Sequence, residues 1–221
     1  MPYVGQTITE VFPTSISVDS ATIKGDTTIG DASAADKKIL FDGNAVDYHI
    51  GLDDSADSLI IGKGSALGTT TSMAFNADGI ITKPLQPAFL VQPTSTQSNF
   101  SVGSHEQVIL SAEKFDNNAD FGSNVFTAPV TGKYQFNANL YLVNIDSASD
   151  FYQLRLVSSN RSLSAVIDPD FGQDNVYFSL NFTALIDMDV NDTAYLDIRQ
   201  GSGTAQTDID NGTTFSGYLV A

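Results

Sequence analysis

Residues 126–136 read FTAPVTGKYQF, and this stretch decides the fold of the C-terminal part of the chain. After Gly132, the aromatic residues Tyr134 and Phe136 alternate with polar residues. A period of two is typical of a half-buried β-strand. Pro129 and Gly132 stand just before this run, and because Pro fixes φ while Gly accepts unusual dihedral angles, they indicate a turn. The stretch is therefore predicted to form a strand, a turn and a second strand.

The composition is typical of a globular protein. The chain has 221 residues, of which 42% are hydrophobic, enough for one large or two small domains. It contains no Cys, which excludes disulfide, iron–sulfur and thiolate chemistry. No apolar run is long enough to cross a bilayer, and the N-terminus has neither the basic end nor the apolar core of a secretory signal. We therefore expect no membrane insertion, and export only by a route such as cell lysis.

The chain is strongly acidic, with a formal net charge of −16. Such a charge repels phosphate backbones and anionic lipids, so nucleic-acid binding is not expected. The acidic residues are spread along the chain and form no tail. The simplest explanation is solubility, or adaptation to a salty medium that screens the self-repulsion.

The chain divides into three regions, and no window shows a helical stripe of apolar residues. Residues 1–30 are polar and too short to bury a core, and we expect them to form an anchoring arm. Residues 31–83 contain short apolar runs, and residues 84–221 contain longer ones. The boundary is KPLQP at 83–87, where two Pro disfavour both helix and central strand.

The middle region, residues 31–83, is predicted to be a β-rich stalk. Its apolar runs are three to five residues long and end in Asp-Gly, Gly-Lys-Gly or Ala-Asp-Gly, which are reversal signals between strands. Hairpins of this size are marginal in water, so their apolar faces need a cover. Identical chains around one axis would supply it, which predicts a symmetric, trimeric stalk. A small independent β-domain is the alternative.

Residues 84–221 are predicted to form an antiparallel two-sheet sandwich. The region is long enough to bury a full core. Its apolar runs are numerous and evenly spaced, as in all-β sandwiches. The predicted strands are AFLVQP, QVILSAEKF, NVFTAPV, KYQFNANLYLVN, FYQLRLVSS, SLSAVID, VYFSLNFTALIDM, TAYLDIRQG and TTFSGYLVA.

The spacing F-x5-G-x-Y-x-F, formed by Phe126, Gly132, Tyr134 and Phe136, resembles the central signature of the globular head of complement's q subcomponent, a tumour-necrosis-factor-like jelly roll. PAFLVQPT at 87–94 resembles the opening strand of that family. IDMDVNDTAYLDI and the C-terminal TTFSGYLVA resemble its last turn and its closing strand. This chain has Ala138 where the family has an aromatic residue, and it has no Gly-X-Y collagen repeat.

The resemblance implies an all-β jelly-roll head of ten strands that assembles as a tight homotrimer. It also implies that aromatic residues fill the trimer axis or core. The residues assigned to this role are Phe126, Tyr134, Phe136, Tyr141, Phe215 and Tyr218.

Three phrases in the middle region, DKKILFDG, GLDDSADSLIIGKG and AFNADG, resemble the stalk segments of bacteriophage tail fibres and other virion fibres. This resemblance implies that the protein belongs to a virion. It also implies that residues 1–30 contact other virion proteins.

No constellation of catalytic residues stands out. His49 and His105 lie in different regions, and no Ser occupies a G-x-S-x-G elbow. The many carboxylates could supply an acid and a base for polysaccharide cleavage, but nothing distinguishes two of them. We therefore do not expect an enzyme.

No cofactor is expected, with calcium as the one open case. Carboxylates paired in loops are ligands that hard cations take. Asp208 and Asp210 form the pair assigned to a metal, and the alternative is that these acids are simply solvated. The other pairs of this kind are Asp146 with Asp150 and Asp168 with Asp170.

Receptor recognition is predicted on the loops at the ends of the sandwich, since a rigid scaffold presents its connections there. The candidate loops are residues 117–123, 145–151, 169–175 and 200–211. Tyr152, Phe171 and Tyr177 are the aromatic residues that could stack on a sugar. The alternative for all three is a core or trimer contact.

These observations predict a trimeric virion fibre or spike whose head attaches to a host protein or glycan. A non-adhesive capsid decoration or structural virion protein is the first alternative. A fibre-borne polysaccharide-degrading enzyme and a secreted bacterial adhesin are the others.

Overall fold

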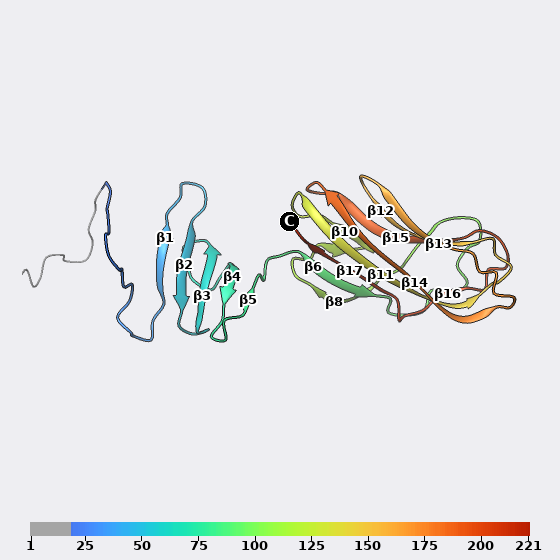
Figure 1. The fold of residues 1–221 in the computed structure, drawn as a ribbon, viewed down its shortest axis with the longest axis horizontal. Helices are drawn as coiled ribbons and strands as arrows, with labels where there is room; N and C mark the ends of the chain where they lie inside the picture. The colour runs from blue at the N-terminus through green and yellow to red at the C-terminus, as the bar shows by residue number, and fades with distance from the viewer. Residues whose placement is uncertain (1–18) are drawn as a thin grey trace, which may run out of the picture.

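The computed structural model describes residues 19–221, and every regular element in that range is a β-strand. The strands form one five-stranded sheet followed by two six-stranded sheets, and all the paired strands are antiparallel (Figure 1). The all-β prediction is confirmed. Most of the predicted anchoring arm, residues 1–18, lies outside the described residues. Within residues 19–221, no helix is long and apolar enough to cross a membrane.

The first sheet contains its strands in chain order, each paired with the next. The predicted reversal signals occupy its connections: Asp42-Gly43 follows β1, and Gly64 and Gly79 adopt φ of +91° and +79°. At such angles a residue with a Cβ is strained, so glycine is the residue that suits these turns. The bounds are β1 (Lys37–Phe41), β2 (Tyr48–Asp53), β3 (Ser58–Lys63), β4 (Thr71–Phe75) and β5 (Ile81–Thr82).

Residues 83–87 connect this sheet to the head, the segment that the sequence indicates as the boundary. The strands of the head are β6 (Ala88–Gln92), β7 (Glu106–Gln107), β8 (Ala112–Asp116), β9 (Phe121–Gly122), β10 (Val125–Thr127), β11 (Gly132–Ile145), β12 (Tyr152–Ser158), β13 (Ser162–Ile167), β14 (Asn175–Met188), β15 (Thr193–Gln200), β16 (Asp208–Ile209) and β17 (Thr214–Leu219).

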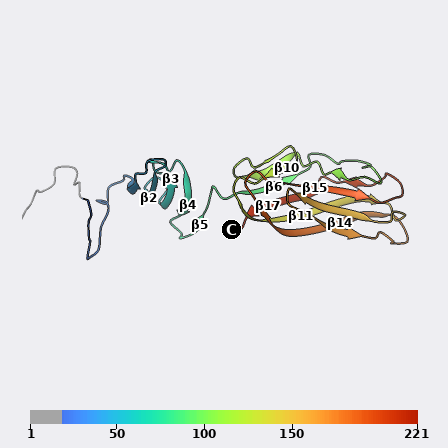
Figure 2. The same ribbon diagram turned by 90° about the horizontal axis from the view of Figure 1, so that it is seen from above.

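The head is a sandwich of two sheets, which Figure 2 shows as two layers. One sheet has the order β13-β12-β15-β10-β9 and the other β14-β11-β17-β6-β8. These two paths contain ten strands, as the family resemblance implies. The two-residue strands β7 and β16 add to them by pairing with β15 and β11. The predicted antiparallel jelly-roll sandwich is confirmed.

The stretch at 126–136 holds the two sheets together. Its turn does not close a hairpin but carries the chain from β10 in one sheet to β11 in the other. Phe126 and Phe136 therefore enter the same interior from opposite layers, and their ring centroids lie 5.6 Å apart. Such contacts between aromatic rings add to the free energy of burial. The rest of this aromatic cluster consists of Phe89, Phe121, Tyr134 and Phe215.

The Gly of the closing Phe-Ser-Gly strand is required by a close approach of rings. A Cβ on Gly217 would lie 2.7 Å from Cδ1 of Phe136 and 2.7 Å from Cε1 of Phe89. Gly132 is similarly restricted, because a Cβ there would lie 2.8 Å from the carbonyl oxygen of Ala221. The two glycines thus let β11 and β17 pack against the cluster and the chain end without overpacking.

Candidate functional site

The main candidate surface of the head is the outer side of the sheet β14-β11-β17-β6-β8, which we call the open face. Cross-strand partners in an antiparallel sheet project to the same side. Gln135 of β11 is opposite both Leu185 of β14 and Tyr218 of β17, so these three side chains lie on one side of the sheet. The residues on either side of Gln135 in β11 are Tyr134 and Phe136, which point into the sandwich.

Apolar side chains are exposed at the end of the open face nearest the five-stranded sheet. Phe115, Leu185 and Tyr218 are 49%, 55% and 48% exposed. Leu90 is opposite Phe115 in the neighbouring strand and is half-buried. We call these four residues the basal cluster. A lone protomer leaves this cluster in contact with water.

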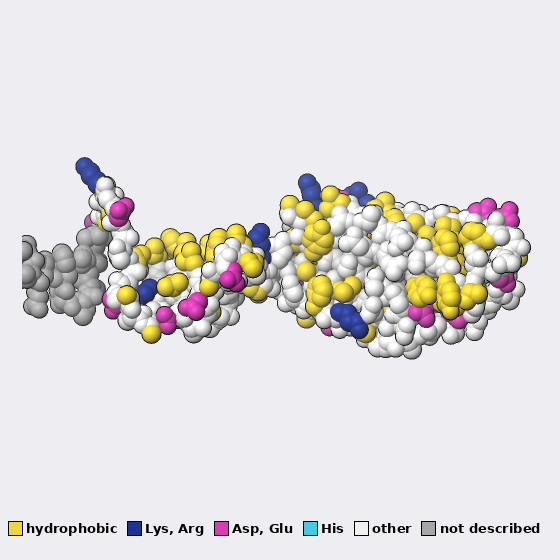
Figure 3. Space-filling model, turned by 60° about the horizontal axis from the view of Figure 1, so that its bottom comes forward, with side chains coloured by type: hydrophobic (Ala, Val, Ile, Leu, Met, Phe, Trp, Pro, Cys, Tyr) yellow, Lys and Arg dark blue, Asp and Glu magenta, His cyan; other side chains and the backbone are white. Residues whose placement is uncertain are grey.

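The opposite end of the open face has a second apolar group, the apical pair Tyr141 and Tyr177. Their rings are stacked with centroids 5.9 Å apart, and Tyr177 is 65% exposed. A Cβ on Gly212 would lie 2.8 Å from Cδ1 of Tyr141, so that glycine leaves room for the ring. Figure 3 shows hydrophobic side chains gathered toward both ends of the head.

Between the two apolar groups, the open face is polar and uncharged. Gln135 donates a hydrogen bond to the Thr183 hydroxyl at 2.7 Å, and Thr183 donates one to Asn137 Oδ1 at 3.0 Å. Asn137 and Thr183 line a shallow depression together with Asn139, Asn181, Thr214 and Ser216. The open face therefore combines apolar ends with a hydrogen-bonding centre.

Three of the four predicted recognition loops meet at the end of the head that is remote from the five-stranded sheet (Figure 1). Asp174 connects them: its Oδ1 accepts hydrogen bonds from the backbone N–H and hydroxyl of Ser147, at 2.9 and 2.8 Å. Its Oδ2 accepts one from Gln206 Nε2 at 2.9 Å. We call residues 145–151, 169–175 and 200–211 the apical loops.

The fourth predicted loop, residues 117–123, lies at the other end of the head. Asn117 and Asn118 donate hydrogen bonds to the carbonyl oxygens of Gln86 and Leu85, in the connection to the five-stranded sheet. This loop is therefore a junction between the two parts and does not join the apical loops.

The three aromatic residues assigned to recognition have different surroundings. Phe171 is 40% exposed in an apical loop and stacks on Phe178, while Tyr177 is exposed on the open face. Tyr152 has no exposed surface, and its hydroxyl bonds to the Thr207 hydroxyl at 2.6 Å. The assignment of Tyr152 to receptor binding is therefore wrong. It is a core residue, because its ring lies on the side of β12 that faces the interior of the sandwich.

Most of the aromatic residues assigned to the trimer axis or core lie inside one protomer. Phe126, Tyr134, Phe136 and Phe215 are at most 1% exposed, so they cannot line an axis between copies. The axis part of that assignment is wrong for these four, because the second sheet of the same chain covers them. Tyr141 and Tyr218 remain, and both lie on the open face.

The carboxylates assigned to a metal are already engaged in hydrogen bonds. Asp208 accepts one from the backbone N–H of Asn99 at 2.8 Å, and Asp210 accepts one from that of Gly212 at 2.8 Å. Within residues 19–221, no group of three or more His, Asp or Glu side chains is placed to hold a metal ion. The structure thus brings no third carboxylate or imidazole to this pair.

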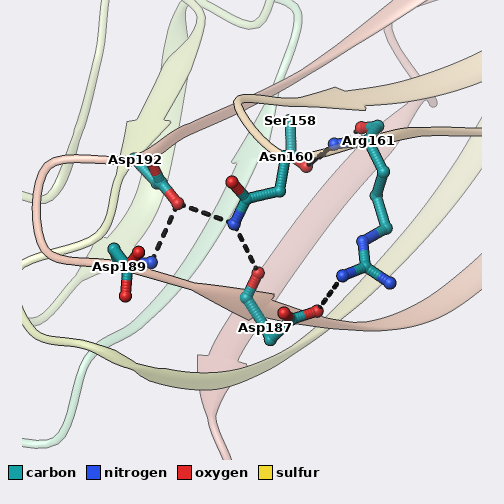
Figure 4. Close-up of polar contacts among 6 residues, drawn as sticks. All are labelled: Ser158, Asn160, Arg161, Asp187, Asp189 and Asp192. Atoms are coloured by element: carbon teal, nitrogen blue, oxygen red, sulfur yellow. Dashed lines mark hydrogen bonds and ion pairs between the residues drawn. The ribbon is translucent and has the colours of Figure 1, made fainter.

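The acidic turn between β14 and β15 has a structural explanation, which Figure 4 shows. Asp192 Oδ2 accepts hydrogen bonds from the backbone N–H of Asp189 at 2.8 Å and from Asn160 Nδ2 at 2.9 Å. Arg161 pairs with Asp187 next to them. These contacts hold the turn to the β12–β13 connection, so its acids maintain local geometry.

The hydrogen bonds of Asp174 set how it titrates. The backbone N–H of Ser147, followed by the Gln206 amide, holds the pKa of Asp174 below its usual value of 3.8. Because the folded-state pKa is lowered, the contribution of Asp174 to stability is present above pH 3.8 and is lost as the pH falls through the lowered pKa. NMR titration should give a midpoint below 3.8. The double variant Ser147→Ala, Gln206→Ala removes the Ser147 hydroxyl and the Gln206 amide but keeps the backbone donor, so it should move the midpoint part of the way up. An unchanged midpoint would contradict the role of these two side chains.

The other sheet of the head carries a partly buried ion pair on its outer side. Asp197 is 5% exposed and accepts hydrogen bonds from Arg155 Nε at 2.8 Å and Nη2 at 2.5 Å. His105 Nδ1 lies 3.3 Å from the same carboxylate. These bonds hold the pKa of Arg155 above its usual value.

The Arg155→Ala variant should lose about 3 kcal/mol of the free energy of unfolding, because it leaves the Asp197 carboxylate buried with half of its partners. Urea unfolding at fixed protein concentration measures this loss. The double variant Arg155→Leu, Asp197→Leu should recover most of it, since apolar residues replace a buried ion pair at little cost. Equal losses in the two variants would show that packing, and not charge, accounts for the effect.

The geometry is that of a recognition module: a rigid two-sheet sandwich with an exposed interaction face and clustered loops at one end. The chain belongs to the C1q domain family, whose model matches residues 88–220. Domains of this family form homotrimers, bind other molecules and are generally non-enzymatic. The predicted resemblance to the complement head is confirmed.

Solved structures similar to the chain include the globular domain of zebrafish complement 1qA, at 21% identity and a TM-score of 0.44. That alignment covers 62% of this chain and 98% of the zebrafish chain. Murine APRIL at pH 8.0 is 8% identical with a TM-score of 0.46, over 61% of this chain and 99% of its own. No curated protein matches the chain.

The sequence analysis missed Leu90, Phe115 and Leu185, which form most of the basal cluster. The signal that could have found them is a strand with apolar residues in both phases. VYFSLNFTALIDM, which forms most of β14, buries Leu180 and Ile186 and still exposes Tyr177 and Leu185. A strand of that kind needs a cover on both sides.

Proposed function

We propose that the protein is a homotrimeric fibre or spike protein of a virion, a bacteriophage in the first instance, which attaches to the host cell surface through its C-terminal head. The observation that carries the proposal is the open face, whose apolar ends a single protomer leaves in water. Exposed apolar clusters of this kind mark protein interaction sites. Membership of a family that forms homotrimers supports a second and third copy as the cover.

In this proposal each of the three regions of the chain has a separate role. Residues 1–30 bind other virion proteins, residues 31–83 form a trimeric stalk, and residues 84–221 form the head. The apical loops lie at the end of the head remote from the stalk, so they are the first part to meet a host protein or glycan. Tyr141 and Tyr177 on the open face then contact a neighbouring copy, which leaves Phe171 as the aromatic residue that faces the receptor.

Attachment can be tested with the purified full chain. Labelled protein is incubated with a panel of bacterial strains, and saturable binding to at least one strain is expected. Phe171→Ser should abolish most of that binding, whereas Val190→Ser, an exposed residue of the β14–β15 turn at the other end, should leave it unchanged. A trimeric, folded protein that binds no strain would leave a decoration or structural component as the function. A folded monomer would remove the trimeric spike altogether.

A further inference from the structure

The first sheet has one side made almost entirely of apolar side chains. In β1 to β3, Ile39 is opposite Ile50, and Ile50 is opposite Ile61, so the three residues lie on the same side. The register extends this side across all five strands. We call it the stalk face, and its members are Ile39, Phe41, Tyr48, Ile50, Leu52, Leu59, Ile61, Met73, Phe75 and Ile81.

The stalk face is exposed in the protomer, while the centre of the other side of the sheet is covered. Phe41, Tyr48 and Ile81 are 54%, 51% and 53% exposed. On the other side, Ile60 and His49 are buried beneath the connection between β3 and β4. His49 Nδ1 bonds to the carbonyl oxygen of Gly64 there, at 2.8 Å. Within residues 19–221, the chain thus covers the centre of one side of this sheet and leaves the apolar side bare.

The chemistry of the stalk face restricts what can cover it. Its interior has no charged residue, and Lys37 and Lys63 stand only at its margins. A charged or strongly polar partner would lose hydration there and gain no compensating contact. The occupant must present a flat, apolar surface of similar size, and the same face of another copy meets this condition.

The size of the stalk face fits self-association of copies that the head already holds together. With strands about 4.8 Å apart and a rise of about 3.3 Å per residue, the sheet presents roughly 20 Å by 17 Å, or about 350 Å². Three such faces total about 1,000 Å², or about 350 Å² for each pair of copies, which is below the size of an interface that is stable alone. The connection at 83–87 is only five residues long, so a trimeric head would hold the three sheets at high effective concentration.

We infer that the stalk faces of three copies pack against one another around the fibre axis, as the three inner sides of a prism. This inference rests on the proposed trimer and names the surface that closes its stalk. The stalk would then be a second assembly element, outside residues 88–220 that the family model matches.

The chain has no Cys, so a single introduced thiol reports on its surroundings without background. Ile50→Cys places a thiol within the stalk face, and Leu40→Cys places a matched thiol on the other side of the same sheet. Leu40 is 40% exposed and Ile50 is 37% exposed, so a thiol-reactive cross-linker reaches both sites in the free protomer. Each full-length variant is treated with a short bismaleimide, and its mass in solution is measured before treatment.

We expect the Ile50→Cys protein to give covalent dimers as the main product and the Leu40→Cys protein to give at least tenfold less. The experiment distinguishes failure of the stalk inference from failure of the proposed trimer. A mass of three chains with no difference between the variants would overturn the stalk inference and leave the trimer standing. A mass of one chain would overturn the trimer itself. Equal cross-linking of the two variants would indicate random collision between molecules and would also overturn the stalk inference.

Discussion

The Phe136→Ala variant is expected to lose about 3–5 kcal/mol of the free energy of unfolding, the loss typical of truncating a buried aromatic residue. Phe136 is 1% exposed, and its ring lies 5.6 Å from that of Phe126 and 5.7 Å from that of Phe215. The variant removes the member of the cluster that joins the two sheets. The space left behind cannot collapse fully, because rings from both layers surround it.

The measurement is urea unfolding of the full chain, with all proteins at the same concentration because assembly and folding are linked. Val166→Ala is the control: it changes an exposed side chain of β13, in the other sheet and away from the open face. That variant should stay within about 0.5 kcal/mol of the parent. If Phe136→Ala also stayed within this range, the aromatic cluster would not be what stabilises the sandwich.

The Leu185→Asp variant is expected to convert the trimer into monomers. Leu185 is 55% exposed in the protomer, so the substitution should leave the fold of a single head intact. In the proposed trimer, the new carboxylate would be buried against another copy without a partner, and an unpaired buried charge is strongly unfavourable. The chain already carries a net charge of −16, so one more negative charge per copy adds to the repulsion.

Light scattering gives the mass that decides this prediction. Val166→Asp is the control, since Val166 is 56% exposed on β13 of the other sheet and carries the same change in charge. The parent and the control should have a mass of three chains, and Leu185→Asp a mass of one. A trimeric Leu185→Asp protein would show that the open face is not where the copies of the head meet.

The sequence was sufficient to predict the class of fold, because the spacing of Phe126, Gly132 and Tyr134 depends on local geometry. Alternation shows that Tyr134 and Phe136 share one side of a strand. It does not show whether that side is covered by the same chain or by another copy. The axis assignment of these residues was wrong for this reason, since the covering layer comes from β10, β12 and β15 through contacts distant in the sequence.

The apical loops show the same limit. Their positions at the ends of strands followed from the turn residues, but their grouping did not. Asp174 joins Ser147 to Gln206 across separations of 27 and 32 residues, and nothing local to Asp174 distinguishes it from the other acids. Tyr152 was misassigned because it stands at the boundary between a loop and β12, and only the tertiary contacts decide that its ring points inward.

The order of the two parts along the chain has a consequence for biosynthesis. β1 to β5 emerge from the ribosome first. The head cannot complete its fold until β17 has been synthesised, since β17 lies between β11 and β6. Throughout that delay each nascent polypeptide exposes a hydrophobic sheet that is prone to aggregate, and no trimeric head yet aligns it with the sheets of other copies. We therefore expect recombinant yield to improve at slow translation and with a co-produced chaperone, and premature termination products that retain only residues 1–87 to precipitate.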